Sequence, residues 1–90
     1  MNTDAFTAEA KAAGFTEFYE RDLTEALGPE PHTHDFDARL LVTGGSITLT
    51  IGGQATTYAA GDSCEVLRGT VHAEQVGPEG VKLFVAKRTA

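Results

Sequence analysis

Three histidines carry the residue types and the spacing that could bind a metal in this sequence. His32 and His34 are two positions apart, and His72 is the third histidine of the chain. In a β-strand, residues two apart lie on the same face, about 6.6 Å apart between their α-carbons. Two imidazoles placed in this way can direct nitrogens to one ion, with bonds of roughly 2.1 Å. We expect the three histidines to form a divalent-metal site, although the pair alone also fits two exposed histidines without a ligand.

The elements that would position these histidines are short strands. From Phe15 onward, apolar or alternating runs are separated by glycine and proline, which is typical of consecutive antiparallel strands. The expected strands are residues 15–21, 34–43, 46–51, 54–59, 63–67, 71–76 and 82–87. Tight turns are expected at Gly44-Gly45 and Gly52-Gly53, because glycine tolerates positive φ values, and another turn at residues 77–80. This pattern predicts an all-β sandwich or barrel.

A short helix is expected before the strands, over residues 3–14. Thr3 or Asp4 would cap its start and Gly14 would end it. Phe6, Ala10 and Ala13 share one face, so we expect the helix to pack on the barrel or on a partner subunit. Residues 1–14 are therefore assigned to the same domain as the barrel of residues 15–90.

The spacing of glycines around the histidines resembles the first motif of the small single-domain cupins. His32 and His34 match its two histidines, and Gly45 matches its closing glycine. Gly28 stands closer to His32 than the opening glycine of the motif does. Ala38 stands at the position of the motif's glutamate.

The second cupin motif is matched in its spacing around the third histidine. The matching residues are Gly61, Gly69 and His72, while Leu67 and Val76 replace the proline and asparagine of the motif. The resemblance implies a double-stranded β-helix, or jelly-roll barrel, in which the three histidines bind a divalent transition metal. Without the motif's glutamate, three imidazoles suit zinc, nickel, iron or copper better than manganese or magnesium.

A carboxylate from another position can take the place of the missing glutamate. Glu74 has the same strand parity as His72, so its side chain is expected on the same face. It is therefore a candidate carboxylate near the metal, or a catalytic base. The alternative is that Glu74 lies at an edge and faces solvent. Asp37 has the opposite parity to His34 and would need a bulge to reach the ion. Water is the remaining alternative.

The apolar residues between these motifs are expected to fill the barrel interior or to line its pocket. They are Phe36, Leu40, Val42, Leu49 and Ile51. Arg39 falls on the opposite face from the histidines, where we expect an ion pair or an interface. Cys64 is expected to be either a small buried residue or a soft group that lines the pocket, and no catalytic role is assigned to it.

The overall composition restricts the partners. A net charge of −6 repels the phosphates of nucleic acids. One cysteine cannot form an internal disulfide, which favours a reducing cytoplasm, and no run approaches the roughly 20 apolar residues of a membrane helix. A chain of 90 residues predicts one domain, and exposed barrel edges favour a homodimer.

Three functions agree with these observations. The first is a metal-dependent enzyme of the dioxygenase, isomerase or lyase type that acts on a small molecule. The second is a non-catalytic module that binds or senses a small ligand. In the third, the metal is structural or adventitious.

Overall fold

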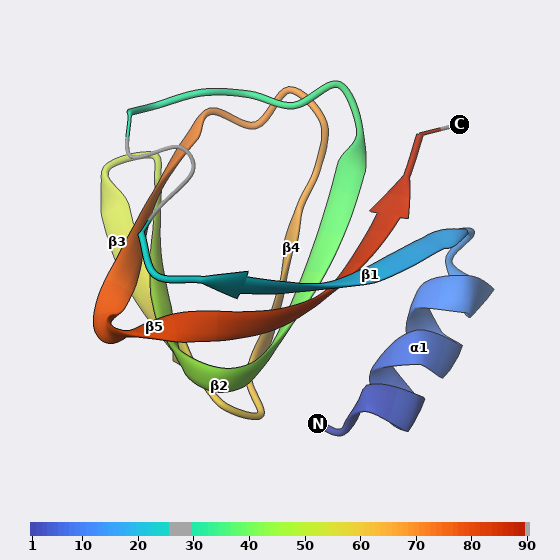
Figure 1. Cartoon of the computed structure of the whole chain (residues 1–90). Helices are drawn as coiled ribbons and strands as arrows, with labels where there is room; N and C mark the ends of the chain where they lie inside the picture. The colour runs from blue at the N-terminus through green and yellow to red at the C-terminus, as the bar shows by residue number, and fades with distance from the viewer. Residues whose placement is uncertain (26–29, 90) are drawn as a thin grey trace.

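The computed structural model describes residues 1–25 and 30–89, and in this part of the chain it contains one helix and five strands (Figure 1). The helix is α1 (Thr3–Ala12), and the strands are β1 (Glu17–Leu23), β2 (Asp37–Ile51), β3 (Gln54–Ala59), β4 (Ser63–Val66) and β5 (His72–Arg88). The all-β prediction is confirmed. Gly28, which was compared with the opening glycine of the motif, lies outside the described residues. No helix in the described ranges has the length and apolar character needed to cross a membrane.

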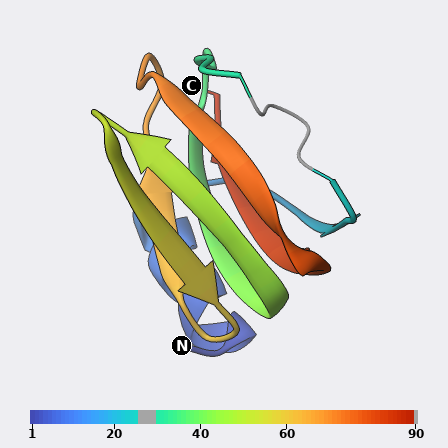
Figure 2. The same ribbon diagram turned by 90° about the vertical axis from the view of Figure 1, so that its left-hand side faces the viewer.

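The five strands form one antiparallel sheet that curls around an interior (Figures 1 and 2). Its order is β1-β5-β2-β3, with β4 paired to β2. The first part of β2, residues 37–42, pairs with residues 83–88 of β5, and its last part, residues 47–51, pairs with residues 72–76. The two long strands therefore bend together, and each contributes to both sides of the barrel.

The expected turns at Gly44-Gly45 and at residues 77–80 are wrong. Residues 46–51 continue the preceding strand to form β2, and residues 71–76 and 82–87 fall almost wholly within β5. Register shifts between Val42 and Gly44 and between Gly45 and Ile47 mark bulges at the bend. A glycine pair is compatible both with a bend inside one strand and with a turn between two strands, so the sequence alone does not distinguish these two structures.

Gly45 shows why the bend needs glycine. Its φ of 68° lies in the left-handed region, and an added Cβ would lie 2.1 Å from the carbonyl oxygen of Gly80. The closing glycine of the cupin-like motif thus permits a close backbone approach between β2 and β5. By contrast, Gly52 and Gly53 do form the expected hairpin turn, with φ values of 59° and 80° between the paired Ile51 and Gln54.

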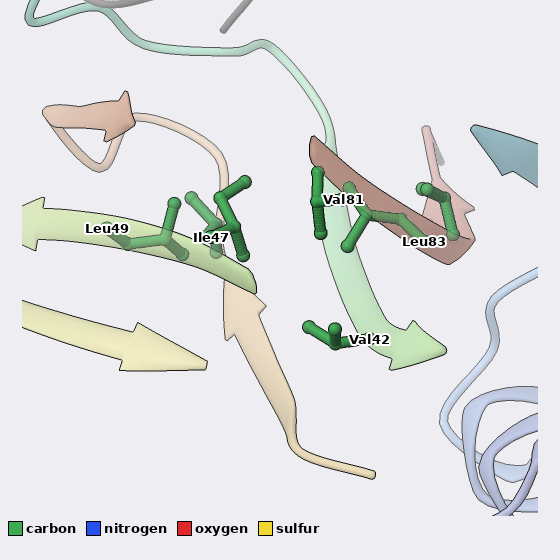
Figure 3. Packing of buried hydrophobic residues seen from close by; sticks show 7 residues of the cluster. Val42, Ile47, Leu49, Val81 and Leu83 are labelled. Carbon is green, nitrogen blue, oxygen red and sulfur yellow. The ribbon is translucent and has the colours of Figure 1, made fainter. Parts of the chain in front are cut away.

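The core inside the barrel comes from alternating residues of the long strands β2 and β5, together with Val66 of β4 (Figure 3). Its buried members are Val42, Ile47, Leu49, Val66, Val81, Leu83 and Val85. The predicted interior positions of Val42 and Leu49 are confirmed. Ile51 was expected inside but is 39% exposed, because it ends β2 next to the hairpin turn.

The helix packs on the outer face of β2 and β5. Phe6 and Ala10 are buried against Phe15, Leu41 and Ala86 in a second apolar cluster. The helix therefore packs on the barrel of its own chain, which is one of the two arrangements expected from the sequence. Its end is followed by Gly14 with a φ of 89°, as predicted.

The start of the helix differs from the prediction. Asn2, rather than Thr3 or Asp4, is the N-cap, and its side-chain oxygen accepts a hydrogen bond of 2.8 Å from the amide of Ala5. All three residue types are good caps, so composition did not separate them.

Candidate metal centre

The backbone brings two distant histidines side by side. The amide of His32 donates to the carbonyl of His72 at 2.9 Å, and the amide of His72 donates to the carbonyl of His32 at 3.0 Å. His72 begins β5, whereas His32 lies in the segment before β2, which runs beside the β4–β5 connection (Figure 1). The strand expected to start at residue 34 starts instead at Asp37, so His34 lies outside it.

The three imidazoles converge with one carboxylate. Ring centroids are 4.3 Å apart for His32 and His72, 4.8 Å for His34 and His72, and 5.1 Å for His32 and His34. Glu74 Oε2 lies 3.3 Å from His32 Nε2 and 3.6 Å from His72 Nε2. One donor atom from each of the four residues lies within 4.8 Å of the others. This geometry offers three nitrogens and one oxygen to a single ion.

Hydrogen bonds to backbone carbonyls orient two of the rings. His32 Nδ1 lies 2.8 Å from the carbonyl oxygen of Glu30, and His72 Nδ1 lies 2.9 Å from that of Thr70. A carbonyl only accepts, so each Nδ1 carries the proton and donates. The Nε2 lone pairs are thereby left for an ion, which is the usual arrangement around metal-binding histidines.

His34 contributes an unsatisfied nitrogen. Its Nδ1 is buried and has no hydrogen-bond partner among the described residues, while its ring stacks on Phe36 with centroids 4.6 Å apart. Burial lowers the pKa of His34 below its usual 6.5, and the neighbouring His72 and His32 lower it further. His34 therefore favours the neutral form, the one that coordinates metals. Together with the donor set, these features fit a transition-metal ion.

A cavity of about 470 Å³ opens beside the cluster. All three histidines and Glu74 line it, and Phe36 and Leu40 belong to its wall, as expected from the sequence. Residues of β1, including Tyr19 and Arg21, also line it and were not identified from the sequence. The alternation of side chains along β1 indicates that Tyr19 and Arg21 share one face, but it does not show whether that face meets the cavity.

Asp37 lies outside the cluster and binds arginines instead. One of its carboxylate oxygens accepts a hydrogen bond of 2.8 Å from the backbone amide of Arg68, and its carboxylate also contacts the side chains of Arg68 and Arg88. These interactions hold the pKa of Asp37 well below its usual range. The opposite parity predicted for Asp37 agrees with this arrangement.

The Asp37 contacts support the histidine site indirectly. Arg68 begins a segment in which the amide of Gly69 donates to the carbonyl of His34 at 3.0 Å, and Thr70 accepts the Nδ1 proton of His72. Asp37 thus anchors the segment that binds the backbone of His34 and orients the imidazole of His72.

We expect Asp37→Asn to lower the melting temperature at neutral pH, because the neutral amide loses the charge-assisted bonds to both arginines. The folded-state pKa of Asp37 is depressed, so its contribution is full above the unfolded pKa and is lost as pH falls through the lower folded value. The melting-temperature difference between wild type and variant should therefore shrink below about pH 4. Thermal melts from pH 7 to pH 2 measure it, and a difference independent of pH would contradict this role.

Two residues outside the cluster behave as expected from the sequence. Arg39 forms an ion pair with Glu65 at 2.8 Å. Cys64 is partly buried, and burial together with the charge of Glu74 raises the pKa of its thiol to about 12. The thiol remains protonated at neutral pH, which agrees with the absence of an assigned catalytic role.

The structure resembles solved cupin structures, although the sequence comparisons give no match. No protein-family model matches the sequence, and no curated protein matches it. The structure is similar to a cupin-2 domain containing protein from Shewanella frigidimarina, with a TM-score of 0.66 and 18% identity, covering 98% of this chain and 93% of that one. It is also similar to an RmlC-like cupin family protein with a double-stranded β-helix fold from Methanocaldococcus jannaschii, with a TM-score of 0.65 and 20% identity, covering 79% of this chain and 67% of that one.

A third similar structure is an enzyme. Acireductone dioxygenase from Bacillus anthracis, with a cadmium ion in its active centre, has a TM-score of 0.75 at 13% identity. The match covers 97% of this chain and 61% of the dioxygenase chain. The chain therefore has the cupin fold, the double-stranded β-helix.

Proposed function

We propose that this protein is a metal-binding cupin that holds one divalent transition metal through His32, His34, His72 and Glu74 and receives a small molecule in the adjoining cavity. The observation that carries the proposal is the convergence of four donor atoms within 4.8 Å of one another. These residues come from two segments joined by reciprocal backbone hydrogen bonds, so the arrangement belongs to the fold.

The donor set indicates which ions would fit. Three imidazole nitrogens with one carboxylate oxygen suit zinc, nickel, iron or copper. When bound, such an ion would supply Lewis acidity or redox chemistry toward an oxygen-bearing small molecule. The dioxygenase with cadmium in its active centre supports the view that this fold accommodates a divalent ion.

Glu74 is the proposed catalytic residue as well as the fourth ligand. Its side chain is 17% exposed and lines the cavity, so it has access both to the histidine cluster and to a molecule in the cavity. A carboxylate in that position can accept a proton from the bound molecule and return it. Glu74 thus takes the role that Ala38, at the glutamate position of the motif, cannot fill.

We expect Glu74→Gln to keep the fold but to lower zinc affinity about 10- to 100-fold, because an amide oxygen carries no charge to offset that of the ion. Competition titration of metal-free protein against a chromophoric chelator measures this affinity. The matched control is Glu65→Gln, which removes an exposed carboxylate from the Arg39 ion pair and should leave zinc affinity unchanged. Equal affinity in wild type and Glu74→Gln would remove Glu74 from the ligand set.

A further inference from the structure

Arg21 is placed on the cavity wall by the alternation of β1. Tyr19, Arg21 and Leu23 all line the cavity, so this face of the strand meets the interior. The Arg21 guanidinium lies 5.4 Å from the centroid of the Tyr19 ring. This cation–π contact holds the charged group against the wall and reduces the freedom it would lose on binding.

Arg21 differs from the other three arginines because they form ion pairs with acidic residues. Arg39 pairs with Glu65, and both Arg68 and Arg88 contact Asp37. Within residues 1–25 and 30–89, no ion pair is formed by Arg21, although the whole sequence contains 13 acidic residues against seven basic ones. In the described part of the chain, the exposed Arg21 side chain therefore presents a guanidinium to the cavity without an ion-pair partner.

The other residues of the cavity wall indicate which kind of molecule the cavity would bind. Aliphatic residues are the largest group in its lining: Leu23, Ala38, Leu40, Leu49, Val66, Leu83 and Val85. Its charged residues, apart from the histidines, are Arg21, Glu30 and Glu74. A divalent ion in the cluster would leave one net positive charge in the cavity, which favours a monoanion over a dianion such as a phosphate monoester.

We propose that the natural ligand is a small monocarboxylate with an apolar body, and that Arg21 binds its carboxylate while the opposite end approaches the histidine cluster. This inference rests on the proposed metal function, because the ion supplies the positive charge at the other end. The planar guanidinium matches a carboxylate with two parallel hydrogen bonds, which makes Arg21 a specificity-determining residue.

Two-ended probes test this role in zinc-loaded protein. Alkyl hydroxamates of increasing chain length bind the metal through the hydroxamate, and each length is prepared with either a carboxylate or a carboxamide at the far end. Calorimetry on wild type should show about three- to tenfold tighter binding of the carboxylate-ended probe at one or more chain lengths. In Arg21→Gln this advantage should disappear, while zinc content and affinity for the carboxamide-ended probe stay unchanged.

Two further variants sharpen the test. Arg21→Lys should keep part of the advantage, since a single charge remains. Arg39→Gln, which removes an arginine that does not line this cavity, should keep all of it. Equal binding of the two probe types in wild type, or an advantage that persists in Arg21→Gln, would overturn the inference while leaving the metal function intact. Failure to bind zinc would instead overturn the metal function and the inference with it.

Discussion

Replacing His72 with alanine is expected to lower zinc affinity by roughly a hundredfold or more. Structural zinc sites gain about 10–16 kcal/mol from all their ligands, so one of four donors corresponds to about 3 kcal/mol. His72 is the most buried ligand of the cluster, 2% exposed, and water cannot readily replace it without disturbing its surroundings. Chelator competition on metal-free protein measures the loss.

The His72 prediction needs variants that separate coordination from packing. His72→Gln fills much of the same space but lacks an imidazole, so it should lose zinc affinity to a similar extent while melting close to metal-free wild type. Gln75→Ala, at an exposed position three residues along β5, should bind zinc as wild type does. Wild-type affinity in folded His72→Ala would exclude His72 as a ligand.

Replacing Gly45 with alanine is expected to lower the free energy of unfolding by about 3 kcal/mol. A residue with a side chain at positive φ costs about 1–2 kcal/mol, and relieving a Cβ only 2.1 Å from the Gly80 oxygen adds about 1–3 kcal/mol. For a chain of 90 residues, the melting temperature should fall by roughly 15 °C.

Gly52→Ala is the matched control for Gly45. Gly52 also has a positive φ, 59°, but an added Cβ would meet no atom within 4 Å. Its replacement should therefore cost only about 1 kcal/mol, the conformational part of the penalty. Equal losses in the two variants, measured by thermal or chemical unfolding, would contradict the close approach of β2 and β5 at the bend.

The sequence predicted the features that depend on local pattern. Strand alternation and the Gly52-Gly53 pair predicted β3 and its hairpin, and parity placed Glu74 with His72 and Asp37 away from the cluster. The convergence of His32 with His72 was expected from the resemblance to cupins, because the intervening spacing by itself does not bring two segments together.

Features that depend on distant contacts were not predictable in the same way. The bend at Gly45 is required by the approach of Gly80, and Asp37 meets Arg88 only because β2 pairs with β5. The position of Arg21 in the cavity depends on which face of β1 turns inward. The homodimer and the cytoplasmic location stay predictions from the sequence.

The metal content of protein expressed without a histidine tag shows directly whether His32, His34, His72 and Glu74 hold an ion. Samples prepared aerobically and anaerobically are dialysed and measured by elemental mass spectrometry, together with the His72→Gln variant. We expect about one equivalent of a single transition metal per wild-type chain and a large loss in the variant. Far less than one equivalent in wild type, combined with weak binding of added zinc, nickel, iron and copper, would contradict it.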